Sequence, residues 1–182
     1  RNAEALVEAV CAARVGGAAM LFTPDMSGLL DRDRERVAAK VREEAEDEVL
    51  AAVRAAAREA GLWVHLGSLA LRGPDGRFLN RGFVIDSAGE IRARYDKIHL
   101  FDVDLPTGER IRESESYAPG DRTTVAETPW GGLGLTVCYD VRFPHLYRDL
   151  AKAGAALLSV PAAFTRPTGE AHWRTLLTAR AI

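Results

Sequence analysis

Cysteine is scarce in this sequence, which holds only Cys11 and Cys138, far apart in the chain and without CxxC spacing. Two such residues exclude a disulfide framework and a structural zinc site. The four histidines are also spread without the paired spacing that is typical of metal ligands. We therefore predict no metal site.

Long hydrophobic runs and excess charge of one sign are absent as well. No apolar stretch approaches the length that crosses a bilayer, and the start of the sequence lacks a charged flank followed by an apolar core. The net charge of -2 offers no basic field for nucleic acid or an anionic membrane surface. We therefore predict a cytoplasmic protein that binds neither nucleic acid nor membrane.

The composition is ordinary for a globular protein, with 47% hydrophobic and 27% charged residues. The 182 residues can bury one sizeable core, and we predict a single domain over 1–182. The sequence begins without methionine inside a helix pattern and ends in a helical stripe without a stop signal. We therefore expect a piece of a longer protein, incomplete at its N- and C-termini.

Apolar periodicity and turn residues predict alternating strands and helices. We expect strands at 18–23, 62–71, 78–86, 91–95, 132–137 and 155–160, the third and fourth forming a hairpin. We expect helices at 3–16, 32–60, 143–153 and from 171 onward, and long loops at 104–129 and 161–170. This interleaving predicts an α/β fold with a mixed sheet.

Cys138 stands where an apolar strand stops and a helix is about to begin, in "LGLTVCYDVRFPHLYRDL" (133–150). Backbone N–H groups and the positive end of a helix dipole favour a thiolate at such a turn, so Cys138 is a candidate nucleophile. The alternative is a small buried core residue. We keep that alternative for Cys11, which lies in the middle of a predicted helix.

A cysteine nucleophile needs a base and a group that holds the developing oxyanion. Lys97, in "ARYDKIHLFDV" (93–103), follows a strand and is surrounded by apolar residues. A partly buried ammonium there needs a carboxylate or a negative substrate atom, and the structural alternative is an ion pair with Asp96 or Asp102. Lys40 and Lys152 fall on predicted helix surfaces, as solvated charges.

A carboxylate comes from "MLFTPDMSGLLD" (20–31), where Asp25 follows an apolar strand. It is either a general base or a helix N-cap, and both readings stay open at this point. Strand ends from distant parts of a chain can converge on one site in an α/β sheet. Asp25, Lys97 and Cys138 are therefore candidates for one shared site.

The segments "YDKIHLFDV", "CYDVRFPHLYRDLAKAGA" and "PAAFTRPTGEAHWRTLLTARAI" resemble the carbon–nitrogen hydrolase (nitrilase) superfamily, and "CYDVRFP" resembles its Nit-type, omega-amidase-like branch. The resemblance implies a four-layer α-β-β-α sandwich that assembles into a homodimer or larger homo-oligomer. It also implies a Glu–Lys–Cys catalytic set that needs no cofactor. The motifs carry the lysine onto Lys97, the cysteine onto Cys138 and a second glutamate onto Glu113.

The family's general base falls on Asp25, where the pattern has glutamate. Aspartate draws the carboxylate back by about one methylene, and a misplacement of about 1 Å can cost roughly a hundredfold in rate. The implied mechanism uses Asp25 to take the Cys138 proton, and Lys97 with the backbone N–H of Tyr139 to hold the oxyanion. Glu113 orients the substrate amide or tunes Lys97, and the alternative for Glu113 is a solvated loop charge.

The resemblance implies a small amide substrate that carries a carboxylate at its other end, so a cationic side chain should face the pocket mouth. Arg142, Arg166 and Arg110 are candidates, each with a surface ion pair as the alternative. Phe164 and Thr165 are expected in the pocket wall, and Trp173 in packing. The expected substrate-binding residues are Tyr139, Arg142, Phe164 and Thr165.

Four readings of function remain open. The first is an amidase that uses Cys138, Lys97 and Asp25. The second is a non-catalytic or impaired scaffold, because the expected base is shortened. A nitrilase and a redox sensor at Cys138 are the other two.

Overall fold

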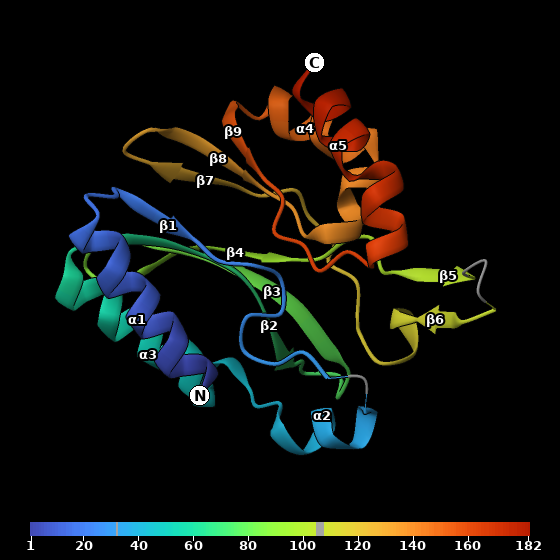
Figure 1. Cartoon of the computed structure of the whole chain (residues 1–182), viewed down its shortest axis with the longest axis horizontal. Helices are drawn as coiled ribbons and strands as arrows, with labels where there is room; N and C mark the ends of the chain where they lie inside the picture. The colour runs from blue at the N-terminus through green and yellow to red at the C-terminus, as the bar shows by residue number, and fades with distance from the viewer. Residues whose placement is uncertain (32, 105–107) are drawn as a thin grey trace.

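The computed structural model describes residues 1–31, 33–104 and 108–182, and its elements form four layers (Figure 1). Two β-sheets stack at the centre. The helices α1 (Asn2–Val15) and α3 (Glu48–Ala60) cover the outer face of one sheet, and α4 (Pro144–Lys152) and α5 (Arg166–Ala181) lie on the opposite outer side. The predicted four-layer α-β-β-α sandwich is therefore confirmed.

The first sheet has four strands in the order β1-β2-β3-β4. Their bounds are β1 (Met20–Phe22), β2 (Trp63–Arg72), β3 (Phe78–Ile85) and β4 (Ile91–Asp96). β1 runs parallel to β2, whereas β3 is antiparallel to both of its neighbours, so the sheet is mixed. The predicted hairpin is present as β3 and β4.

The second sheet has three strands in the order β7-β8-β9 and is also mixed. Its strands are β7 (Val125–Thr128), β8 (Gly131–Leu135) and β9 (Ala155–Ser159). A separate ribbon of β5 (Asp102–Asp104) and β6 (Arg110–Arg112) projects from the body in Figure 1. The mixed sheet that the strand and helix pattern predicted is divided into two mixed sheets, with a ribbon besides.

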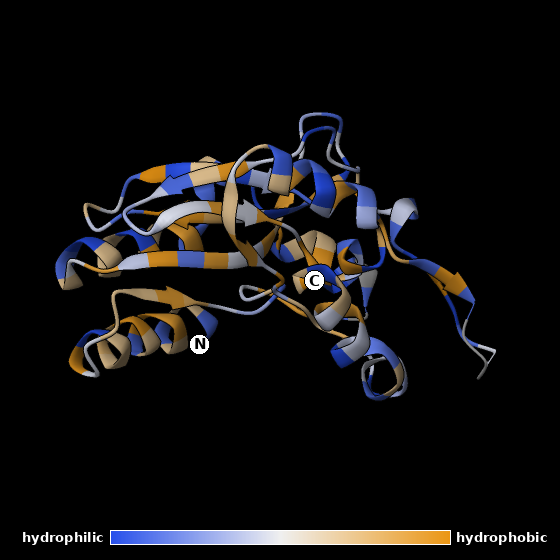
Figure 2. Ribbon diagram, turned by 90° about the horizontal axis from the view of Figure 1, so that it is seen from above, coloured by the Kyte–Doolittle hydropathy of each residue, from blue (hydrophilic) through white to orange (hydrophobic). Residues whose placement is uncertain are grey.

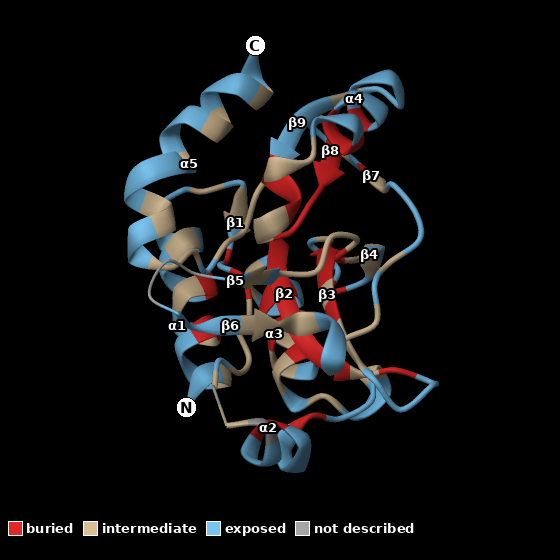
Figure 3. Ribbon diagram, turned by 90° about the vertical axis from the view of Figure 1, so that its right-hand side faces the viewer, coloured by how far each residue is buried: buried red, intermediate tan, exposed pale blue. Residues whose placement is uncertain are grey.

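Apolar side chains fill each interface between layers, because burial of apolar surface is the main favourable term in folding. Val84 and Tyr95 of the first sheet pack against Leu133 and Leu135 of the second. Figure 2 shows hydrophobic segments along the central strands, and Figure 3 shows buried residues concentrated on β2, β3 and β8. In contrast, no described residue of α5 is fully buried.

The long helix predicted at 32–60 is wrong. The chain forms α2 (Arg34–Lys40), a short 3-10 helix (Glu44–Glu46) and then α3. Glu44 is drawn to the sheet, where its carboxylate accepts hydrogen bonds from Arg81 and Arg94 at 2.8 Å each. The backbone is extended at Val41, Glu43 and Asp47, and the Asp47 side chain caps α3 by accepting from the N–H of Leu50. This cap and the ion pairs of Glu44 hold the break in the helix.

Three smaller predictions also need correction. The loop at 104–129 contains β6, a 3-10 helix (Glu113–Glu115) and β7, and the last helix begins at Arg166 rather than 171. Residues 32 and 105–107 of these predictions lie outside the described residues. Cys11 is exposed rather than buried, because α1 turns Leu6 and Val10 toward the sheet. Lys40 and Lys152 are exposed, as predicted.

Across the described ranges, no helix combines the length and the apolar character that crossing a membrane requires.

Candidate active site

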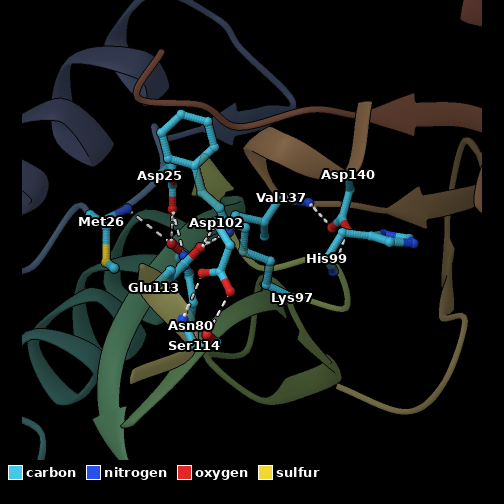
Figure 4. Close-up of polar contacts among 12 residues, drawn as sticks. Asp25, Met26, Asn80, Lys97, His99, Asp102, Glu113, Ser114, Val137 and Asp140 are labelled. Carbon is cyan, nitrogen blue, oxygen red and sulfur yellow. Dashed lines mark hydrogen bonds and ion pairs between the residues drawn. The ribbon is translucent and has the colours of Figure 1, made fainter. Parts of the chain in front are cut away.

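Segments that follow three different strands meet at a cavity of about 700 Å3. Asp25 follows β1, Lys97 follows β4, and Cys138 lies beyond β8. These three side chains and Glu113 all line the cavity, and Figure 4 shows Asp25, Lys97 and Glu113 close together. The structure thus brings together the four residues that the sequence singled out for chemistry.

Lys97 and Glu113 form a buried ion pair. Lys97 Nζ lies 2.6 Å from Glu113 Oε2, and the side chains are only 4% and 11% exposed. Glu113 Oε2 also accepts a hydrogen bond of 2.6 Å from the backbone N–H of Phe101. Burial alone would lower the pKa of Lys97, but the neighbouring acidic groups, Glu113 first among them, outweigh it and raise that pKa. Lys97 therefore stays a cation inside the protein.

The ion pair proposed for Lys97 with Asp96 or Asp102 is wrong. Asp96 is engaged by the guanidinium of Arg81, at 2.7 and 2.8 Å. Asp102 instead accepts hydrogen bonds from the backbone N–H and the hydroxyl of Ser114. Glu113 is likewise not a solvated loop charge.

Asp25 is buried, with 7% of its surface exposed. Its Oδ1 atom accepts hydrogen bonds from Ser68 Oγ at 2.6 Å and from Asn80 Nδ2 at 3.3 Å. Burial raises the pKa of Asp25, and Lys97 and these two hydrogen bonds only partly offset the rise. The helix N-cap reading is wrong, because neither of these donors is a helix backbone N–H.

Gly67 in β2 allows the segment that carries Asp25 to lie directly against the strand. A Cβ atom at Gly67 would collide with the backbone oxygens of Thr23 and Pro24. Only glycine lets two backbones approach so closely, and the approach places Asp25 beside Ser68.

Cys138 opens a short 3-10 helix (Cys138–Arg142) between β8 and α4, on the strand-to-helix turn that the sequence predicted. Its φ of 50° is left-handed, which is uncommon for a residue other than glycine and is typical of strained functional turns. The backbone N–H of Cys138 donates to the oxygen of Pro161 at 2.8 Å, which ties the turn to the segment after β9.

Asp140 anchors this turn from inside the protein. Its carboxylate is fully buried and accepts hydrogen bonds from Tyr95 Oη at 2.8 Å and from the backbone N–H groups of Val137 and His99 at 2.8 and 3.0 Å. It also lies 2.7 Å from His99 Nδ1 (Figure 4). These contacts fix the backbone on both sides of the cysteine.

The expectation that this turn favours a thiolate is wrong. Burial, followed by the charge of Asp25, raises the pKa of Cys138 to about 12, although Lys97 and the backbone N–H of Ala163 act in the opposite direction. Desolvation outweighs the local backbone dipoles. The sulfur is therefore a neutral thiol at rest, and it needs a base to become a nucleophile.

The predicted wall residues Tyr139, Phe164 and Thr165 line the cavity, and so does Arg110. Phe164 also packs edge-on against Trp173, which confirms a packing role for that tryptophan.

Two of the predicted substrate-binding cations are elsewhere. Arg142 is not among the cavity-lining residues, and its guanidinium lies over the rings of Tyr139 and Phe164 at 5.8 and 5.6 Å. Arg166 pairs with Glu170 at 2.8 Å on the surface. Arg142 as a substrate ligand stays a prediction, and the structure shows its guanidinium stacked on two rings that line the cavity.

The sequence analysis missed four residues of this region: Ser68, Asn80, Arg112 and Asp140. Ser68 and Asn80 interrupt the apolar strands "LGSLAL" and "FLNRGF", and a polar residue at a buried strand position is itself a signal. Arg112 lines the cavity and donates to the oxygens of Val103 and Ile111. Within the described ranges, no group of three or more metal-ligating side chains is arranged to hold a metal ion.

The fold agrees with comparisons to known proteins. The family profile of the carbon-nitrogen hydrolases matches residues 1–182, so the chain belongs to the carbon–nitrogen hydrolase family. A deaminated glutathione amidase from Yersinia enterocolitica is 53% identical over 134 residues, covering 71% of this chain and 46% of that protein. The enzyme of the same name from Bos taurus is 40% identical over 176 residues, covering 94% of this chain and 53% of the other.

Two solved structures are similar over the whole chain. The Caenorhabditis elegans NitFhit protein matches with a TM-score of 0.88 and 38% identity, covering 100% of this chain and 44% of that chain. An amidase from Nesterenkonia sp. AN1, seen after Michael addition of acrylamide at its active site cysteine, matches with a TM-score of 0.80 and 30% identity, covering 100% and 67%. The chain spans about half the length of the curated relatives that it matches.

Proposed function

We propose that this chain carries the active site of an amidohydrolase that cleaves a small carboxamide to the acid and ammonia through a thioester on Cys138. The observation that supports this most is one cavity lined by a thiol, a buried ammonium and a buried carboxylate. Family membership supports the same reaction class.

In the first half of the reaction, Asp25 takes the proton from Cys138 Sγ, and the sulfur attacks the amide carbonyl carbon. The C–S bond forms while the carbonyl oxygen becomes an oxyanion, which Lys97 Nζ and the backbone N–H of Tyr139 stabilise. Asp25 then gives its proton to the amide nitrogen. The C–N bond breaks, and ammonia leaves behind a thioester.

In the second half, a water molecule replaces ammonia. Asp25 takes a proton from this water, and the resulting hydroxide attacks the thioester carbonyl. The C–S bond breaks, the acid leaves, and the proton returns to the sulfur. The raised pKa of Asp25 suits both directions of transfer, because its carboxyl group then gives up and accepts a proton nearer to neutral pH.

Glu113 keeps Lys97 charged and fixed in this proposal. The 2.6 Å ion pair and the second hydrogen bond to the N–H of Phe101 leave Glu113 Oε2 little freedom. Lys97 can therefore stabilise the oxyanion without reorganising. A charge that is already in place lowers the barrier more than one that must first move.

The substrate we propose is a small amide with an anionic group at its far end. Arg110 and Arg112 line the cavity, and we propose that they meet such a group in exchange for the ion pairs that both form with Asp104. Relatives named deaminated glutathione amidase support a substrate of this kind.

A catalytically impaired scaffold is the second candidate, and one observation favours it. The base is Asp25, which is one methylene shorter than the glutamate of the family pattern. Such a base meets the thiol less closely, and Cys138 with a pKa of about 12 depends on it entirely.

Ammonia release from a panel of small ω-amides tests the proposal. The parent chain, Asp25→Glu and Cys138→Ala are compared, with Cys11→Ser as the matched control because Cys11 is exposed on α1. We expect Asp25→Glu to raise the rate roughly ten- to a hundredfold, Cys138→Ala to abolish it, and Cys11→Ser to leave it unchanged. Absence of ammonia from both the parent and Asp25→Glu would favour the scaffold.

Two further measurements separate the remaining alternatives. Offering a nitrile and its amide in parallel tests for a nitrilase, which would consume the nitrile. A redox sensor would show thiol oxidation at Cys138 without acyl transfer.

A further inference from the structure

We propose that Ser68 and Asn80 are positioning residues that hold Asp25 by its Oδ1 atom, so that Oδ2 is the oxygen that exchanges the proton with Cys138. This inference rests on the proposed function, since it concerns the base of that reaction. Neither residue touches the reacting atoms, and both act through Asp25.

The two oxygens of Asp25 have different surroundings. Oδ1 accepts from Ser68 Oγ at 2.6 Å and from Asn80 Nδ2 at 3.3 Å. Among the described residues, none forms a hydrogen bond with Oδ2. This oxygen is also not one of the fully buried polar atoms without a partner, so part of its surface is accessible. Asp25 lines the cavity, and in this proposal Oδ2 is the oxygen left to face it, since Oδ1 is held by Ser68 and Asn80.

The direction of the Ser68 hydrogen bond is fixed by its neighbour. The backbone N–H of Met26 donates to Ser68 Oγ at 2.9 Å, so the hydroxyl hydrogen is available for Asp25. Met26 has a φ of 55°, a left-handed conformation that costs energy outside glycine. The strained turn thus aims an N–H group that orients the serine, and the serine in turn orients the carboxylate.

Asn80 links the carboxylate to the lysine. Its backbone oxygen accepts the N–H of Lys97 at 2.9 Å, while its side-chain Nδ2 donates to Asp25. With the amide turned this way, Asn80 Oδ1 is buried and has no hydrogen-bond partner among the described residues. Buried polar atoms are rarely left unpaired, and the exceptions often have a functional cause. Here the orientation of the Asn80 amide gives Asp25 Oδ1 a donor and leaves Asn80 Oδ1 without one.

The first test is the pH profile of amide hydrolysis in Ser68→Ala and Asn80→Leu. Both hydrogen bonds favour the ionised form of Asp25, so their loss should raise the pKa that limits the acid side of the profile. We expect kcat to fall roughly ten- to a hundredfold, with KM nearly unchanged, because the base is misaimed while the pocket is intact.

The matched control is Ser27→Ala. Ser27 is a neighbouring serine whose hydroxyl donates to the oxygen of Pro24 and does not contact Asp25. We expect its pH profile and kcat to equal those of the parent. If Ser68→Ala and Asn80→Leu fold and also keep the parent profile and kcat, the inference is overturned. The two variants remove different donors, so one of them decides the question if the other does not fold.

The second test does not depend on turnover. In a Cys11→Ser background, acrylamide alkylates Cys138 at a rate that mass spectrometry follows as a function of pH. We expect this profile to move to higher pH in Ser68→Ala and Asn80→Leu, but not in Ser27→Ala. A shifted alkylation profile without ammonia release would contradict the proposed function and retain the positioning role. An alkylation profile that does not move would overturn the positioning role.

Discussion

Replacing Asp140 by asparagine tests how the nucleophile turn is held. Asparagine has almost the same shape as aspartate, but it offers one acceptor oxygen instead of two. The four contacts of the Asp140 carboxylate come from Tyr95 Oη, the N–H of Val137, and the N–H and Nδ1 of His99. They are shared equally between Oδ1 and Oδ2. Whichever way the amide of the variant turns, its NH2 group faces a backbone N–H, that of Val137 or that of His99, so one hydrogen bond is lost and a buried N–H is left unpaired.

The size of the effect follows from these contacts. Hydrogen bonds to a charged group contribute about 1.5–3 kcal/mol each, and the replaced oxygen becomes an NH2 group that faces other donors. Asp140 is fully buried, so water cannot take over the lost contacts. We therefore expect the free energy of unfolding to fall by about 3–6 kcal/mol. Against a typical total of about 5–15 kcal/mol, this loss removes a large part of the stability.

Urea unfolding at pH 7, followed by circular dichroism, measures this change. Asp149→Asn is the matched control, because Asp149 is exposed on α4, and we expect it to change the free energy of unfolding by less than about 0.5 kcal/mol. In a Cys11→Ser background, the rate at which acrylamide alkylates Cys138 should also differ between Asp140→Asn and the parent. A loss in Asp140→Asn below about 1 kcal/mol would refute the reasoning.

Three further predictions concern stability. Burial lowers the pKa of His65 to about 4 from 6.5, so the unfolded chain binds the proton first, and stability falls as the pH drops from 6.5 toward 4. The free energy of unfolding of the parent falls between pH 7 and pH 4.5, and His65→Gln should make this fall smaller by roughly 2–3 kcal/mol. An equal fall in the parent and the variant would contradict this. Thr136→Val should cost about 1–3 kcal/mol in urea unfolding, because Thr136 Oγ1 donates to the buried oxygen of Ser159 at 2.6 Å; a neutral result would argue against that bond. Arg81→Met should cost about 1–3 kcal/mol, since Arg81 joins Asp96 and Glu44, and the loss should shrink in 1 M salt.

The sequence predicted the order of strands and helices well, because each element has its own apolar period. The hairpin of β3 and β4 and the turn at Cys138 followed from such local patterns. The break between α2 and α3 was not predicted, although Asp47 caps α3 locally. Its other contacts are distant, because Glu44 pairs with Arg81 and Arg94, which lie 37 and 50 residues further along the chain.

The candidate site shows the same division between local and distant causes. Strand ends pointed to Asp25, Lys97 and Cys138, and the structure places all three on one cavity. The charge state of the sulfur could not be predicted from the turn alone. Burial depends on the whole fold, and it outweighs the local dipoles that favour a thiolate. Local spacing suggested Asp96 or Asp102 as the partner of Lys97, whereas only the family resemblance pointed to Glu113, which is 16 residues away.

Mass spectrometry of the intact chain after incubation with small ω-amides tests the central claim most directly. We predict an acyl adduct that maps to Cys138, persists in Cys11→Ser and disappears in Lys97→Met, because the thiol and the ammonium must act on one carbonyl group. An adduct that forms equally well in Lys97→Met, or that maps to a residue outside the cavity, would contradict the claim that these side chains share a substrate.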